Sequence, residues 1–230
     1  LSSLYLNTYN QYNKILRTRN EYLKILFTNN IADKKYLDIL TEQLIDKATV
    51  IYKLRNEYLE KINKNINSIF KNITGEENLS ILYKPNISFS NYEDDSLKKT
   101  MKEMLNKNYQ RELHIGMTLF GPHRDDFQFQ LNDVDMKLFS SQGQQKSAVL
   151  AYKLSTIPIF EEKNGTKPVL LLDDIFSELD LKKKNRLLKY VNQDIQSIIT
   201  TTDLKNISKK SLENATIFKV SNGNVERSNN

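Results

Sequence analysis

The chain has 230 residues, no cysteine and a formal net charge of +6. The lack of cysteine excludes disulfides and thiolate metal sites, and no apolar run approaches the ~20 residues that a membrane-spanning helix requires. The positive charge is compatible with nucleic acid binding, although a charge of this size is also typical of an ordinary solvated surface. We therefore expect a cytoplasmic protein with one large domain or two small ones.

The first third of the sequence predicts two long helices. No Gly or Pro occurs before Gly75, and apolar residues recur in steps of three and four over residues 5–26 and again over residues 37–69. This spacing places one apolar stripe along each helix. With the polar turn Asn29–Asn30 between them, we expect residues 1–75 to form an antiparallel hairpin, or arm. The Tyr-rich stripe of the first helix is expected to pack between helices rather than stack on nucleic acid bases.

The remaining sequence predicts an α/β lobe over residues 76–220 and a polar, disordered tail over residues 221–230. Asp94 or Asp95 is expected to cap a helix, and Asn132-Asp133 offers a turn. The expected strands cover residues 79–83, 86–90, 127–131, 169–172, 198–201 and 216–220, and the expected helices cover residues 96–108, 144–158 and 182–191.

Two adjacent carboxylates, Asp173 and Asp174, follow the apolar run at residues 169–172. Such a run is typical of a buried parallel strand, and ligands collect at the carboxyl ends of strands in open α/β sheets. One carboxylate there can hold Mg²⁺, directly or through water, while its neighbour orients an attacking water. This is the pattern of a Walker B element. The alternative is a core strand followed by an acidic helix cap.

A second stretch, residues 139–146, opens a helix. Ser141, Gly143 and the free N–H groups of the first turn form a natural seat for a phosphate, and Gln144 can reach past it. The alternative is an ordinary polar N-cap.

Together these stretches resemble the RecF family of bacterial DNA replication and recombination-repair ATPases, which are related to the Rad50 and SMC heads. Ser141–Gln144 resembles the ABC-type signature, with Gln142 where the usual pattern has Gly, and Asp174 stands where most Walker B pairs carry Glu. The further matching stretches are the D-loop at Ser177–Asp180, the switch-histidine region at Ile199–Asp203, with Thr202 where many relatives have His, and Gly121–Asp126. The resemblance implies the second lobe of an ABC-type ATPase, with the helical arm inserted ahead of it.

The resemblance also implies roles for individual residues. Asp174 and Thr202 would be catalytic and Asp173 would hold the metal. The residues that would bind, in trans, the ATP held by a partner subunit are Ser141, Gly143, Gln144 and Asp180. No GxxxxGK[ST] loop occurs in the chain, and in the family this loop lies in an N-terminal lobe. The chain therefore resembles the C-terminal portion of the family, and we expect it to be inactive alone.

For the complete protein the resemblance implies ATP and Mg²⁺ as cofactors and an ATP-dependent homodimer. It would bind DNA at single-strand/double-strand junctions or gaps, act with RecR and RecO in loading recombinase, and take part in the SOS response. Its helical arm would be a coiled coil. Alternatives are a non-catalytic partner-interaction module, in which the hairpin would recruit partners, and a head fragment of another Rad50- or SMC-like ATPase.

The DNA-binding candidates are Lys182, Lys183, Lys184, Arg186 and Arg124. The lysine run has the alternative of a solvated helix face, and Arg124 has the alternative of an ion pair with a neighbouring acid. His123 could pair with Asp125 or Asp126, and a metal site built on the two histidines is disfavoured because other ligands are few.

Overall fold

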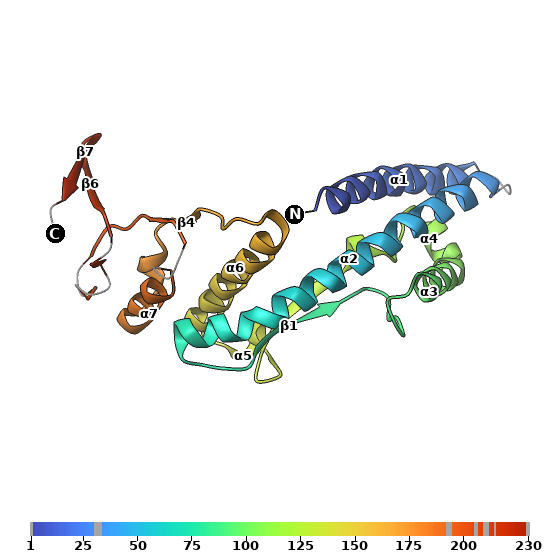
Figure 1. The fold of residues 1–230 in the computed structure, drawn as a ribbon. Coiled ribbons are helices and arrows are strands. Elements are labelled where there is room, and N and C mark those ends of the chain that lie inside the picture. The colour runs from blue at the N-terminus through green and yellow to red at the C-terminus, as the bar shows by residue number, and fades with distance from the viewer. Residues whose placement is uncertain are drawn as a thin grey trace. The chain divides into compact units, whose positions relative to one another are not determined.

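The computed structural model describes residues 2–29, 34–191, 195–204, 207–208, 212–213 and 215–228, with Glu178 described by its backbone alone. The helices are α1 (Ser3–Thr28), α2 (Lys35–Thr74), α3 (Asp94–Lys107), α4 (Tyr109–Ile115), α5 (Met136–Phe139), α6 (Gln142–Asn164) and α7 (Leu181–Val191) (Figure 1). The strands are β1 (Leu79–Lys84), β2 (Asp126–Leu131), β3 (Val134–Asp135), β4 (Leu170–Leu172), β5 (Ser197–Ile199), β6 (Ile217–Ser221) and β7 (Asn224–Ser228). Short 3₁₀ helices are η1 (Pro122–Arg124) and η2 (Ile175–Glu178). No helix in the described ranges is long and apolar enough to span a membrane.

The described chain divides by packing into two compact units. Unit 1 comprises residues 1–61 and 81–128, and unit 2 comprises residues 62–80 and 129–230. Helix α2 contributes residues to both units. The sequence predicts boundaries at residues 75 and 220, which separate the arm, the lobe and the tail. These boundaries divide the chain by expected function rather than by packing, and they stay a prediction.

In unit 1, α1 and the first part of α2 run antiparallel. Arg55 near the middle of α2 donates to the Tyr5 hydroxyl at 3.1 Å, whereas Arg19, further along α1, donates to Thr41, which lies earlier on α2. The core between these helices and α3 is apolar and includes the fully buried Tyr12. The helix-packing role expected for the Tyr-rich stripe is thus confirmed. Asn30 of the expected turn lies outside the described residues.

A buried ion pair ties α1 to α4. The Arg19 Nη2 lies 2.8 Å from Glu112 Oε2, and the two side chains are 2% and 0% exposed. Arg19 also donates to Thr118 and Thr41, while Glu112 accepts from the Leu119 N–H. Burying two charges is costly unless each is paired and hydrogen-bonded, and here both are. The pair therefore fixes how α1, α2 and α4 pack.

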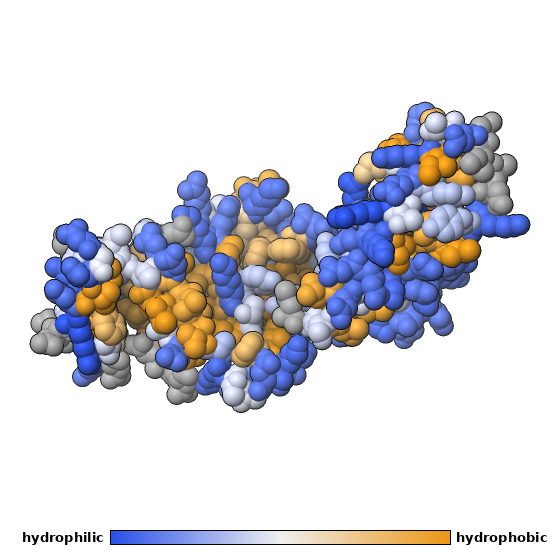
Figure 2. Space-filling view, turned by 90° about the horizontal axis from the view of Figure 1, so that it is seen from above, coloured by the Kyte–Doolittle hydropathy of each residue, from blue (hydrophilic) through white to orange (hydrophobic). Residues whose placement is uncertain are grey.

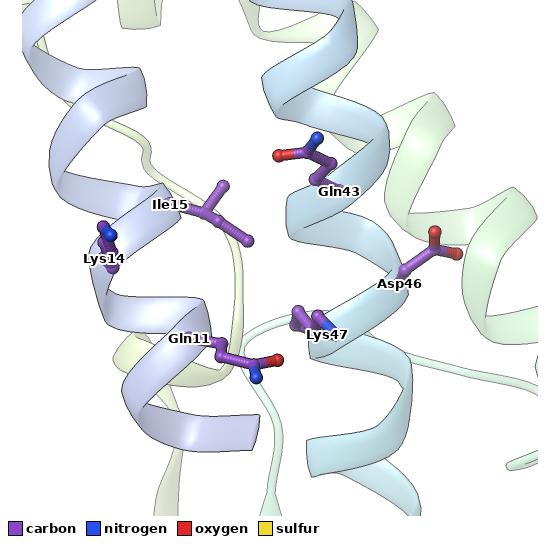
Figure 3. Close-up of a pocket in the computed structure, with 6 residues that line it drawn as sticks. All are labelled: Gln11, Lys14, Ile15, Gln43, Asp46 and Lys47. Carbon is purple, nitrogen blue, oxygen red and sulfur yellow. The ribbon is translucent and has the colours of Figure 1, made fainter. Parts of the chain in front are cut away.

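A shallow hollow of about 400 Å³ lies between α1 and α2. Figure 3 shows its lining of polar and charged side chains with a single isoleucine, Ile15. Asp46 in this lining is paired with Lys98 of α3. The hollow carries no cluster of catalytic or ligand-binding groups.

In unit 2, β4 and β5 pair in parallel, with Leu172 opposite Ile199. The expected parallel strand is confirmed, but its expected burial is wrong. Leu172 is buried whereas Leu171 is 69% exposed, because successive side chains point to opposite faces and only one face of this two-stranded sheet is covered in the described chain. Figure 2 shows apolar residues gathered on the displayed face of unit 2, while unit 1 displays mainly hydrophilic ones.

Several expected elements differ in the structure. Residues 86–90 form bends rather than a strand, and Asp94 pairs with Lys53 instead of capping α3. Helix α6 continues past Pro158, which cannot donate a backbone hydrogen bond, and ends six residues later at Asn164. Gly165 caps it in the left-handed conformation. Within the tail expected to be disordered, residues 224–228 form the second strand of an antiparallel hairpin, β6–β7, and residues 229–230 lie outside the described residues.

One buried hydroxyl in unit 1 yields a stability prediction. Among the described residues the Tyr52 hydroxyl is buried without a hydrogen-bond partner, whereas the Tyr83 hydroxyl donates to Asp125 at 2.5 Å. An unpaired buried polar group is destabilising, so Tyr52→Phe should leave the free energy of unfolding unchanged or raise it by about 1 kcal/mol. Tyr83→Phe, the matched control, should lower it by about 2 kcal/mol because a carboxylate loses a donor. Urea unfolding of the complete protein tests the pair, and equal losses in both variants would contradict the assignment.

Candidate functional site

The acid pair lies where β4 ends. Asp173 and Asp174 are both exposed, and Asp174 adopts the left-handed conformation with φ 46° and ψ 26°. Asp tolerates this conformation better than most residues. The Asp174 carbonyl accepts from the backbone N–H and the hydroxyl of Ser177. The chain therefore turns sharply after Asp173 and enters η2 with its backbone groups satisfied.

Thr200, the residue after β5, contacts both acids. Its hydroxyl donates to Asp173 Oδ1 at 2.5 Å and accepts from the Asp174 N–H at 3.0 Å. Its own N–H donates to the Leu172 carbonyl, which continues the parallel ladder. Thr200 is thus the side chain that holds the acid pair to the neighbouring strand.

Thr202, by contrast, is exposed and makes no hydrogen bond in the described part of the chain. The neighbouring Thr201 bonds locally, with its hydroxyl donating to the Asp203 carbonyl and accepting from the Asp203 N–H. The role expected for Thr202 stays a prediction.

The acid pair fits a divalent cation that also binds a nucleotide. Mg²⁺ in such sites is commonly held by one or two carboxylates together with substrate phosphates and water. Asp173 is exposed and uses one carboxylate oxygen on Thr200, which leaves the other oxygen for a ligand. No group of three or more metal-ligating side chains occurs among the described residues, so the remaining ligands would have to come from phosphate and water.

The signature stretch forms a capping box at the start of α6. Gln144 donates its backbone N–H to the Ser141 hydroxyl at 3.3 Å, and the Gln144 side chain accepts from the Ser141 N–H at 3.0 Å. The Gln144 amide also donates to Glu76 at 2.8 Å. The polar N-cap that the sequence left as an alternative is therefore present. It uses the Ser141 and Gln144 groups that the phosphate seat would need.

Asp180, which the sequence predicts to be part of a D-loop, caps α7. Its carboxylate accepts from the Lys183 N–H at 2.9 Å and lies 3.7 Å from the Lys183 ammonium. The Lys183 backbone hydrogen bond is the main cause that holds the Asp180 pKa below its usual range. A Cβ placed at Gly143 would lie 4.0 Å from the same ammonium. Lys183, 16% exposed, is therefore beside the first turn of α6 as well as the D-loop.

The other basic residues of α7 differ in their surroundings. Arg186 lies against Gly75, where a Cβ would be only 2.4 Å from the guanidinium. This position at the C-terminus of α2 is favourable for a cation. Lys182 is exposed and Lys184 half-buried, and neither makes an ion pair in the ranges described. Lys182 and Lys184 are thus uncommitted, whereas Lys183 and Arg186 each have a neighbour in unit 2.

The loop Gly121–Asp126 in unit 1 is held by hydrogen bonds that its side chains make with other segments of unit 1. The Asp125 carboxylate, 2% exposed, accepts from Arg55, from the Tyr83 hydroxyl and from the Asn86 N–H. His123 contacts the Tyr12 hydroxyl and the Thr118 carbonyl rather than an acid, so the pairing with Asp125 or Asp126 that the sequence suggested is wrong. The reason is that Asp125 is already used by other donors.

Arg124 points away from this network. Its backbone N–H donates to the Gly121 carbonyl at 3.0 Å, whereas its side chain is exposed and makes no hydrogen bond or ion pair among the described residues. The ion pair with a neighbouring acid that the sequence offered as an alternative is therefore absent from the described part of unit 1.

Sequence comparison finds relatives that carry the same name. The chain is 37% identical over 233 residues to the DNA replication and repair protein RecF of Ligilactobacillus salivarius (strain UCC118), covering 100% of the chain and 61% of the relative. It is 39% identical over 227 residues to the RecF protein of Bacillus pumilus (strain SAFR-032), covering 98% of the chain and 61% of the relative. No family model matches.

The fold is also that of solved RecF structures. The structure of the recombination mediator protein RecF-ATPrS in the RecFOR pathway superimposes with a TM-score of 0.82 at 35% identity, over 98% of the chain and 59% of that protein. The chain belongs to the RecF family. It spans about 60% of the length of its RecF relatives and corresponds to a RecF C-terminal portion. The expected α/β fold with its ABC-type relation is confirmed.

Three contacts around these RecF motifs were not expected from the sequence. They are Thr200 on the acid pair, Lys183 beside Gly143, and Glu76 on Gln144. Of these three contacts, only that of Thr200 could have been predicted from the sequence. Parallel strands meet at one edge with their carboxyl ends, so the residue after β5 was a candidate partner for the residue after β4.

The half-buried histidine of the loop, His123, yields a pH prediction. Burial is the main cause that lowers the pKa of His123, so the unfolded chain takes up a proton that the folded protein resists. Stability should then be constant above the ordinary histidine pKa of about 6.5 and fall as pH drops below it. Urea unfolding of the complete protein between about pH 7.5 and about pH 5.5 should show this loss, at most about 1.4 kcal/mol per pH unit. His123→Gln should flatten the profile, and parallel profiles for both proteins would contradict the argument.

Proposed function

We propose that the chain supplies the Walker B, signature and D-loop parts of a RecF-type ATPase that acts in DNA replication and repair. The observation that carries the proposal is the exposed acid pair at the carboxyl end of the parallel pair β4–β5, in a chain of this family. Solved relatives are described with ATP, which supports nucleotide as the ligand. The complete protein, rather than this portion alone, would bind ATP with Mg²⁺.

Within this proposal the two acids have different tasks. Asp173 would hold Mg²⁺, because its carboxylate is exposed and oriented by Thr200. Asp174 would orient the attacking water, and Thr202 would lie near the transferred phosphate. The groups that would meet the nucleotide of a partner subunit are Ser141, Gly143, Gln144 and Asp180. Dimerisation is thus part of the proposed mechanism.

The N-terminus of α6, where the predicted signature lies, has features that support a phosphate-binding site. The first-turn N–H groups of α6 and the Lys183 ammonium beside Gly143 both favour an anion. The Ser141–Gln144 capping box occupies part of this seat. A bound phosphate would therefore accept hydrogen bonds from N–H groups that now donate within the capping box. Phosphate binding would replace the side-chain acceptors at this end of the helix.

We further propose that the complete protein binds DNA through its phosphates at single-strand/double-strand junctions or gaps. The solved relatives are described in the RecFOR pathway, which supports RecR and RecO as partners. In this proposal the protein helps to load recombinase, acts in the cytoplasm and takes part in the SOS response. Lys182, Lys184 and Arg124 are the candidates for phosphate contact whose charges are uncommitted, with Lys183 and Arg186 as further candidates. A coiled-coil role of the helical arm completes the proposal.

Substitution of each acid in the complete protein tests the ATPase assignment. Asp173→Asn should weaken Mg²⁺-dependent ATP binding, because a ligating charge is lost. Asp174→Asn should keep ATP binding and lower the rate of hydrolysis by about 10²-fold or more, because the group that orients water is lost. Asn accepts the left-handed backbone at this position, so both variants should fold. Equilibrium binding of a fluorescent ATP analogue and single-turnover hydrolysis give the two readouts, and equal loss of binding in both variants would refute the assignment.

Charge reversal tests the DNA surface. Lys182→Glu with Lys184→Glu should weaken DNA binding and lower the slope of log affinity against log salt by about 1 for each lost phosphate contact. The matched control is Lys219→Glu with Arg227→Glu in the β6–β7 hairpin, which changes the net charge equally. Fluorescence anisotropy with a gapped duplex at several salt concentrations gives affinity and slope. Equal effects of the two double variants would mean that net charge, not this helix, governs binding.

A further inference from the structure

The parallel register of β4 and β5 places Thr200 opposite Asp173. Leu172 pairs with Ile199, so the next residue on each strand leaves the sheet at the same level. At that point the Thr200 N–H still bonds to the Leu172 carbonyl at 3.0 Å. The Thr200 side chain is therefore placed by the backbone of the sheet.

The Thr200 hydroxyl is used in both directions. It donates to Asp173 Oδ1 at 2.5 Å and accepts from the Asp174 N–H at 3.0 Å. A hydroxyl carries one donor and two acceptor positions, and a β-branched side chain has restricted χ1 freedom. These two bonds therefore fix the rotamer of one acid and the backbone of the next.

The second bond matters because of the conformation of Asp174. A residue other than glycine in the left-handed region is held there by its surroundings, and Asp174 has φ 46°. Its N–H is tied to Thr200 and its carbonyl to Ser177. Together these bonds keep the two carboxylates in a fixed relation to each other.

We propose that Thr200 is a positioning residue that aims the Asp173 carboxylate at a nucleotide-bound divalent cation and locks the Asp174 backbone. The inference rests on the proposed function and adds to it the residue that sets the geometry of the acid pair. Thr200 acts through the acids and touches neither nucleotide nor metal. Hydrogen bonds to metal-ligating groups of this kind typically change metal affinity by about 10–100-fold.

Three variants of the complete protein separate the hydroxyl from the shape of the side chain. Thr200→Val keeps the branched shape without the hydroxyl, Thr200→Ala removes both, and Thr200→Ser keeps the hydroxyl. Because Thr200 is exposed, none of these changes opens a core cavity. Thr216→Val, an exposed threonine just before β6, is the matched control for the same chemical change outside the site.

The measurement is Mn²⁺ binding by electron paramagnetic resonance, with a non-hydrolysable ATP analogue present, together with thermal unfolding without metal. We expect Val and Ala to weaken Mn²⁺ binding about tenfold or more, Ser to restore most of it, and the control to match wild type. Metal-free unfolding temperatures should stay close to wild type. The inference is overturned if Val and Ala bind Mn²⁺ as wild type does, or if Ser is no better than Val.

Asp173→Asn in the same assay distinguishes failure of this inference from failure of the proposed function. If Asp173→Asn loses Mn²⁺ affinity and Thr200→Val does not, only the positioning role fails. If Asp173→Asn binds Mn²⁺ as wild type does, Asp173 is not the metal ligand, and both the metal assignment and the positioning role are overturned. Loss in both, with rescue by Ser, supports both.

Discussion

The register of β4 against β5 is the constraint on which the acid pair depends. With Leu172 opposite Ile199, the residues that follow the two strands meet at one edge, and the Thr200 hydroxyl reaches both Asp173 and the Asp174 N–H. A slip of one residue would turn every side chain of the strand to the other face, and it would remove Thr200 from this position. The sharp turn at Asp174, the bonds from Ser177 and the entry into η2 follow from the same point. Functional geometry is therefore set here by main-chain pairing, and the side chains complete it.

The helix ends in unit 2 use the same residues that the RecF motifs single out. Ser141 and Gln144 cap α6, and Asp180 caps α7 while its carboxylate lies near Lys183. A helix N-terminus has a limited set of free N–H groups, so a side-chain cap and a bound phosphate draw on the same donors. Residues that serve both as caps and as motif residues stabilise the free protein. The helix N-terminus that they cap still favours the binding of an anion. Their presence as caps is accordingly consistent with a site in which the ligand replaces an internal partner.

Much of the fold could be predicted from the sequence because long periodic segments carry a strong signal. The 40-residue helix α2, the strand β2 and the helix α7 follow directly from apolar spacing. Short elements did not, since α4 and α5 have only 7 and 4 residues. The β6–β7 hairpin did have a local signal, Asn222-Gly223, both with positive φ, and this dipeptide is typical of tight hairpin turns. The acid pair was recognisable from its strand and motif, whereas Thr200 and Glu76 required knowledge of which segments lie side by side.

The basic residues illustrate why charge alone could not define a binding surface. Arg19 and Arg55 are tied to Glu112 and Asp125, and their charges stabilise the packing of unit 1. The Gly121–Asp126 loop turns His123 and Asp125 inward, and a Cβ at Gly121 would lie 2.4 Å from the Tyr12 hydroxyl, so the loop backbone has little freedom. Arg124 is left as its outward cation. An uncommitted arginine on a fixed backbone can bind a phosphate without ordering the loop, so that only its side chain loses conformational entropy on binding. The same inward network that removes His123 and Asp125 from contact with a ligand therefore makes Arg124 the residue of this loop best suited to one.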